Sequence, residues 1–227
     1  MRIDFPPIRV FAVVMVTAIC LLTPLPGKCT NHVGPPKPSC ETLPQAALIL
    51  MPIARTVILN AGMYAGLVIL WPHAFAPKQG TTDSFRESFS TPPYMNSKQV
   101  FFQLDDDPWF INTILHGIYG SEVYLSARTY GHNAMIGFLY AAFASTTWEY
   151  LVESWFHRPS GIDLIWTPFA GAVIGELRFQ LMRLILRRVP SRGVRIALVS
   201  LLDPLGQLER LMLGCRLGDE NGCQMAR

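Results

Sequence analysis

Polar residues suited to chemistry recur at helical spacing in three otherwise apolar stretches of the chain. The residues are Asn112 and His116, then Ser145, Glu149 and Glu153, then Asp163 and Thr167. Residues four apart lie on one face of an α-helix, so three packed helices would bring these side chains into a shared interior. A histidine among carboxylates is suited to general acid–base catalysis or to metal binding. The candidate catalytic residues are therefore His116, Glu149, Glu153 and Asp163.

The same residues also fit a structural role. They would then form a hydrogen-bond network that fixes the helix register, with Asp163 capping the start of the third helix. A buried, unpaired carboxylate would cost several kcal/mol, so each acid needs a partner. The arginines available to them are Arg128, Arg158 and Arg178. Di-metal helical bundles carry Glu-x-x-His on two helices, and this sequence has none, so we expect no metal and no cofactor.

Start and stop signals divide this part of the chain into helices. Acids at 105–107 before Pro108 mark a helix start. Such signals, together with the apolar periodicity, predict helices over 108–128, 134–156, 162–188 and 194–213. The last of these is expected to bend around 203–206. Gly171 and Gly175 are spaced for close helix packing. No segment has the period of a strand. The predicted fold is all-α, a hydrophobic bundle of three to four packed helices.

The first half of the chain predicts one further hydrophobic helix. The predicted helix covers 45–72, of which 46–71 are apolar apart from Arg55 and Asn60. It includes a second Gly-x-x-x-Gly pair, which makes it a candidate membrane helix. Residues 29–44 form a proline-rich linker, and the polar residues 73–103 are expected to be an exposed loop. The helical domain then occupies 104–213, followed by a tail over 214–227.

The N-terminus has the layout of an exported protein. Residues 1–28 begin with basic residues, continue with an apolar run and end at helix breakers, which predicts a signal peptide or, alternatively, an N-terminal anchor. Removal of this segment would leave four cysteines, an even number that suits an oxidising compartment. The disulfide candidates are Cys29, Cys40, Cys215 and Cys223. Free thiols are the alternative.

Composition and charge narrow the class of partner. The chain of 227 residues is 50% hydrophobic and only 15% charged, which excludes a disordered chain and favours a membrane or an unusually large core. The net charge is +3, and eight arginines lie between Glu176 and Arg216 among aliphatic residues. Without aromatic stacking residues, this pattern favours anionic lipid over nucleic acid. The expected lipid contacts are Arg187, Arg188, Arg192 and Arg195.

A long ordered set of polar and small residues is similar to the signature of a known family. The set comprises 107–112, His116, Gly120–Ser121, Tyr124–Leu125, Ala127–Arg128, Gly131, 144–146, 148–150, Glu153, Pro159–Ser160, Asp163–Leu164, Thr167–Pro168, Gly171 and Gly175–Glu176. Over 103–213 the chain resembles the bacterial family called domain of unknown function 3943. The resemblance implies a place in the bacterial cell envelope and no particular activity.

These observations leave three hypotheses for function. The first is a membrane-associated envelope protein with a structural or interaction role, whose partners are membrane lipid and, as further candidates, other envelope proteins. The second is a membrane-embedded hydrolase or transferase that acts on lipid or cell-wall material through the His116 and carboxylate cluster. The third is a small transport or proton-relay component. If the helices span the membrane, the arginines favour a cytoplasmic C-terminus. The signal-like start and the cysteines instead favour the periplasmic side. The choice between inner and outer membrane stays open.

Overall fold

The computed structural model describes residues 45–70, 72, 81–96, 98, 109–212 and 217–218. Its elements, in chain order, are α2 Gln45–Leu70, α4 Thr81–Ser90, the π-helix η2 Ile111–Leu115, α5 His116–Thr129, α6 Ala134–Thr147, the π-helix η3 Trp148–Val152, the 3₁₀-helix η4 Glu153–Trp155, α7 Gly161–Arg188, α8 Arg192–Leu202 and α9 Pro204–Met212. Within these ranges the regular elements are helices, so the predicted all-α fold is confirmed.

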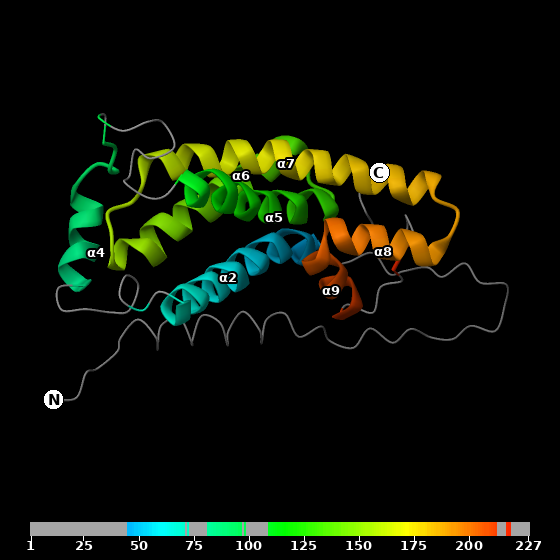
Figure 1. The fold of residues 1–227 in the computed structure, drawn as a ribbon, viewed down its shortest axis with the longest axis horizontal. Coiled ribbons are helices and arrows are strands. Elements are labelled where there is room, and N and C mark those ends of the chain that lie inside the picture. The colour runs from blue at the N-terminus through cyan, green and yellow to red at the C-terminus, as the bar shows by residue number, and fades with distance from the viewer. Residues whose placement is uncertain are drawn as a thin grey trace.

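Helix α5 lies at the centre of the bundle, packed against α7, α6 and α2 (Figure 1). Helix α7 runs the length of the molecule, α8 packs against its C-terminal part, and α4 packs against η4 at the opposite end. At the crossing of α5 and α7, a Cβ on Gly171 would meet the backbone of Gly120, and one on Gly175 would meet the ring of Tyr124. These glycines let the two helices approach closely. A Cβ on Gly62 or Gly66 would meet nothing within 4 Å.

Side-chain caps fix where α6 and α7 begin. Asn133 Oδ1 accepts a hydrogen bond from Ile136 N at 2.9 Å, and Ser160 Oγ accepts one from Asp163 N at 3.2 Å. Such caps satisfy amide groups that have no partner within the helix. The cap of α7 is therefore Ser160, and the expectation that Asp163 caps this helix is wrong. Asp163 instead lies in the first turn.

The structure corrects the expected helices in three places. Helix α4 lies within the predicted loop over 73–103, because Phe85 stacks on Trp155 and Phe89 contacts Tyr150. The second predicted helix changes from α to π geometry at Trp148. The fourth divides into α8 and α9 at Asp203, whose Oδ1 accepts a hydrogen bond from Gly206 N at 2.9 Å. The predicted signal, linker and disulfide cysteines lie outside the described residues.

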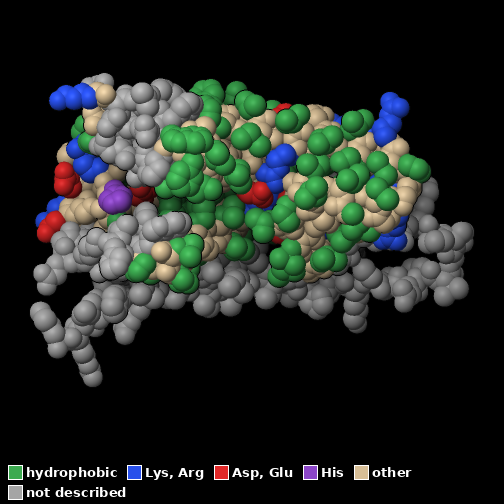
Figure 2. All heavy atoms as spheres, viewed as in Figure 1, with side chains coloured by type: hydrophobic (Ala, Val, Ile, Leu, Met, Phe, Trp, Pro, Cys, Tyr) green, Lys and Arg blue, Asp and Glu red, His purple; other side chains and the backbone are tan. Residues whose placement is uncertain are grey.

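The polarity of the bundle is the reverse of that of a water-soluble domain. Its buried side chains are polar or charged about as often as they are apolar, while Val173, Leu177 and Phe169 of α7 are 72%, 69% and 59% exposed. Between Trp109 and Leu186 no Asp, Glu, Lys or Arg is exposed. The exposed charged residues of the described chain are Asp83, Arg86, Glu87, Lys98, Arg187, Arg188 and Arg192. Figure 2 shows hydrophobic side chains over much of one face, with charged groups toward its ends and one group of acidic and basic side chains near its middle.

Candidate functional site

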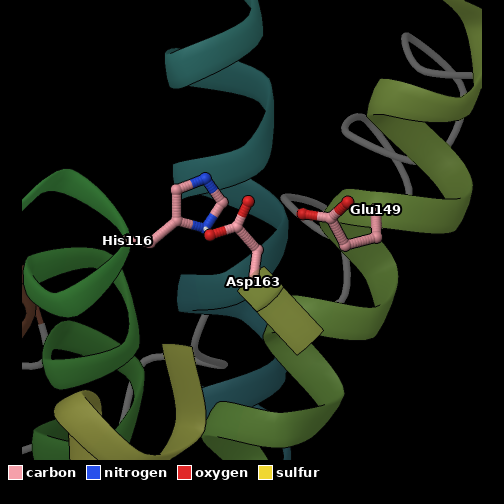
Figure 3. Close-up of side chains that lie close together, drawn as sticks. All are labelled: His116, Glu149 and Asp163. Atoms are coloured by element: carbon pink, nitrogen blue, oxygen red, sulfur yellow. Dashed lines mark ion pairs between the residues drawn. The ribbon is translucent and has the colours of Figure 1, made fainter. Parts of the chain in front are cut away.

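Three of the four candidate catalytic residues meet at one end of the bundle. His116 begins α5, Glu149 lies in η3, and Asp163 lies in the first turn of α7. One side-chain ligand atom from each lies within 4.8 Å of the other two. The side chains point toward one another, with the Asp163 carboxylate between the other two groups (Figure 3). We call these three residues the histidine cluster.

Hydrogen bonds hold the members of the histidine cluster in place. His116 Nδ1 lies 3.0 Å from Thr167 Oγ1 and 3.6 Å from Asp163 Oδ1. The backbone N–H of Ser160 donates to Glu149 Oε2 at 2.6 Å. His116, Glu149 and Asp163 are 9%, 0% and 1% exposed. Burial strengthens the electrostatic interactions within the cluster and favours a proton or a cation beside its two carboxylates.

Both π-helical turns of the described chain adjoin this cluster. The turn η2 ends directly before His116, and η3 contains Glu149. A π-helical turn inserts an extra residue into an α-helix, which changes the direction of the side chains that follow, and such turns are frequent at functional sites. Local sequence spacing assumes a regular helix and therefore does not reveal them.

The remaining residues of the predicted network divide between this cluster and other contacts. Ser145 Oγ donates to the backbone oxygen of Asp163 at 2.9 Å, and Asn112 is fully buried in η2. Glu153 belongs to a separate pair of contacts. It accepts a hydrogen bond from Trp148 Nε1 at 2.9 Å and lies 3.8 Å from His157 Nδ1.

The arginines expected to pair with Glu149, Glu153 and Asp163 bind elsewhere, so that expectation is wrong. Arg128 Nε lies 2.7 Å from Glu176 Oε2. Arg158 donates to the Pro92 carbonyl at 2.6 Å. Arg178 Nη2 lies 2.5 Å from Glu122 Oε1. Each arginine reaches a neighbouring helix or loop that spacing along its own helix does not specify.

A second buried group, which the sequence analysis missed, lies on α2, α5, α7 and the chain around α9. Arg55 is 2% exposed and binds Glu209 with two hydrogen bonds, Nε to Oε1 at 2.7 Å and Nη2 to Oε2 at 2.8 Å. Its Nη1 lies 3.3 Å from Asp203 Oδ1. We call the whole group the arginine cluster, and its members are Arg55, Glu122, Arg178, Asp203, Glu209 and Arg210.

Tyr130 closes one side of the arginine cluster. Burial, together with the nearby Glu209 carboxylate, raises the pKa of the Tyr130 hydroxyl. The hydroxyl therefore stays protonated and donates to Glu209 Oε2 at 3.0 Å. The only sequence signal for this cluster was a lone arginine in an apolar helix, because its partner Glu209 lies 154 residues further along the chain.

The arginines expected to contact lipid lie at the C-terminal end of α7 and on α8. Arg187, Arg188 and Arg192 are exposed. Arg195 is half-buried, and its Nε donates to the Gly218 carbonyl at 2.7 Å while Nη1 donates to the Val189 carbonyl at 3.1 Å. Three of the four side chains are thus exposed at the surface of the bundle, where a lipid head group could contact them.

Fold and site together define an all-α domain of inverted polarity with two buried polar clusters. Residues 101–205 match the family described as Domain of unknown function (DUF3943). This segment carries the domain of that family, which confirms the resemblance found in the sequence. The match contains the whole histidine cluster, whereas Arg55, Glu209 and Arg210 lie outside it. Neither the curated proteins nor the solved structures contain a match to the chain.

Proposed function

We propose that this protein is a membrane-embedded helical protein of the bacterial cell envelope with a structural or interaction role. The observation that carries the proposal is the inverted polarity of the bundle. From Trp109 to Leu186 every charged side chain is buried or half-buried. The side chains that are exposed in this range are mainly apolar. Water would disfavour such a surface, whereas hydrocarbon favours it as long as the polar groups inside are satisfied.

Helix α7 has the dimensions of a membrane-facing helix. Its 28 residues span about 42 Å, and the hydrocarbon core of a bilayer is about 30 Å thick. An exposed apolar stripe runs along it: Ile165, Phe169, Val173, Leu177, Leu181 and Leu184. The charged residues of α7 that precede Leu186 lower its mean hydropathy, but they face other helices or are half-buried.

Helix α2 supplies a second line of support. Within the described chain, Leu48–Leu70 is the one segment long and apolar enough to cross a membrane by length and composition. Its single charged residue, Arg55, is neutralised by Glu209 and Asp203 inside the bundle. Ionisable residues within a bilayer are expected to pair in this way.

The exposed arginines suggest how the domain meets the membrane surface. Arg187, Arg188 and Arg192 follow the apolar stripe of α7, where anionic head groups would attract them. Membrane lipid is thus the first partner of the proposal, and other envelope proteins are the second. The signal-like N-terminus favours the periplasmic side of the envelope for the parts of the chain that lie outside the bilayer.

Extraction tests the membrane proposal. The full chain should stay in the membrane pellet after carbonate and salt washes and should dissolve only in detergent. Val173→Arg places a charge in the apolar belt and should cost about 2–4 kcal/mol if Val173 faces hydrocarbon, which moves protein to the soluble or degraded fraction. Thr82→Arg on α4 is the matched control and should behave like the parent. Release of the parent by carbonate alone would overturn the proposal.

A second candidate function is hydrolysis or group transfer on lipid or cell-wall material. The meeting of His116, Glu149 and Asp163 at one end of the bundle favours it, because a general base and carboxylates are then available together. Glu149→Gln retains an acceptor for the Ser160 amide and should leave the fold intact. Altered lipid or cell-wall composition in cells that carry this folded variant would support an enzyme, and unchanged composition would leave the structural role.

A further inference from the structure

We propose that the histidine cluster binds one divalent transition-metal ion, with His116, Glu149 and Asp163 as its protein ligands. The three residues come from three different helices, and a ligand atom of each lies within 4.8 Å of the others. One imidazole nitrogen with two carboxylate oxygens is a donor set suited to Zn²⁺, Mn²⁺ or Fe²⁺. The proposal departs from the sequence-based expectation of no metal.

The distances are close to those of a loaded site. In a tetrahedral Zn²⁺ site with bonds of about 2.1 Å, ligand atoms lie about 3.4 Å apart. His116 Nδ1 and Asp163 Oδ1 are 3.6 Å apart. The other two pairs of ligand atoms lie within 4.8 Å, so the cluster would have to contract around an ion. The three side chains already converge on one region (Figure 3).

The surroundings of the cluster provide a supporting shell. The Ser160 amide donates to Oε2 of Glu149 at 2.6 Å, which holds the carboxylate in position. Thr167 Oγ1 lies 3.0 Å from His116 Nδ1, and an ion bound at that nitrogen would replace this contact. Three protein ligands with an open position are typical of catalytic rather than structural Zn²⁺ sites.

The two buried carboxylates of the cluster would both attract a cation. Glu149 and Asp163 are almost fully buried, and like charges at this separation repel strongly in a medium of low dielectric constant. A divalent ion would attract both. The site does not depend on the membrane proposal, and it would supply activated water to the second candidate function.

Metal content of the purified full chain tests the site. After chelation and removal of the chelator, the parent should take up about one Zn²⁺ per chain, measured by mass spectrometry of the eluted metal. Co²⁺ in place of Zn²⁺ should give visible absorption bands of a nitrogen–oxygen site. Glu149→Gln and Asp163→Asn should each weaken binding at least tenfold, because each removes an anionic ligand.

Glu153→Gln is the matched control, because Glu153 lies near the cluster but binds Trp148 and His157 instead. It should bind metal like the parent. Circular dichroism and gel filtration identify variants that fail to fold, and the isosteric substitutions avoid creating cavities. Parent protein that takes up no Zn²⁺, Mn²⁺ or Fe²⁺, or a folded Glu149→Gln/Asp163→Asn double variant that binds as tightly as the parent, would overturn the proposal. Neither result would touch the membrane proposal, which extraction tests separately.

Discussion

The two buried clusters of the bundle are built on different principles. The arginine cluster contains three guanidinium groups, from Arg55, Arg178 and Arg210, and three carboxylates, from Glu122, Asp203 and Glu209. The histidine cluster contains two carboxylates and one imidazole. Equal numbers of opposite charges suit a permanent structural contact. An imidazole beside two carboxylates, from three different helices, offers the donor set of a cation site.

The clusters also differ in what they connect. The histidine cluster lies wholly within the family match over 101–205. The arginine cluster ties that segment to α2 and to the end of α9, through Arg55, Glu209 and Arg210. The arginine cluster therefore fastens the flanking helices to the segment that matches the family, whereas the histidine cluster lies within that segment alone.

The largest expected effect comes from breaking the arginine cluster. Arg55→Met should lower the free energy of unfolding by about 3–5 kcal/mol, because it leaves Glu209 and Asp203 buried without their main partner. The free energy of unfolding is measured in detergent, with circular dichroism as the probe of helix content. Arg192→Met, at an exposed position, should change stability by less than about 0.5 kcal/mol. Equal effects at the two positions would contradict a structural role for the cluster.

The next prediction concerns the helix crossing that lies between the clusters along α5 and α7. Gly171→Ala should destabilise the protein by about 1–3 kcal/mol, because the new Cβ meets the backbone of Gly120. Gly62→Ala is the control, since its Cβ meets nothing within 4 Å, and it should be neutral or stabilise by about 1 kcal/mol. Thermal unfolding compares the two. A neutral Gly171→Ala would show that the helices separate at little cost.

Much of the fold followed from signals local in the sequence. The break at 157–161 and the prolines at 190 and 204 mark helix limits, and periodicity excluded strands. The helix start predicted at 105–108 lies outside the described residues. The helix α4 was missed because Phe85 and Phe89 stabilise it by contacts with residues about 60 to 70 positions away. Tertiary packing of this kind overrides a polar local composition.

The candidate site was predicted only in part, for a related reason. Spacing of four residues placed His116, Glu149 and Asp163 on inward helix faces, and the structure brings them together. The same spacing wrongly grouped Glu153 with them, because η3 interrupts the α-helical register between Glu149 and Glu153. Charge partners were not predictable either, since each arginine pairs across helices rather than along one.

A matched pair of substitutions sharpens the contrast in charge. Asp203→Asn should destabilise the protein by about 1–3 kcal/mol, because the arginine cluster loses one of its balancing charges. Asp163→Asn, in metal-free protein, should change stability by less than about 1 kcal/mol, because it relieves repulsion with Glu149 while removing one contact with His116. Chemical denaturation of both variants in the presence of a chelator measures the difference. Similar losses in the two variants would show that the clusters are alike.

The smallest expected effect separates the cap of α7 from the histidine cluster beside it. Ser160→Ala removes the hydroxyl that accepts from Asp163 N but keeps the backbone N–H that donates to Glu149. Stability should fall by about 1 kcal/mol, as it should for Asn133→Ala at the cap of α6. Zn²⁺ affinity should be unchanged in both variants, because the ligands keep their supporting hydrogen bonds. A selective loss of affinity in Ser160→Ala would instead mean that the cap positions Asp163, and that the first turn of α7 belongs to the site.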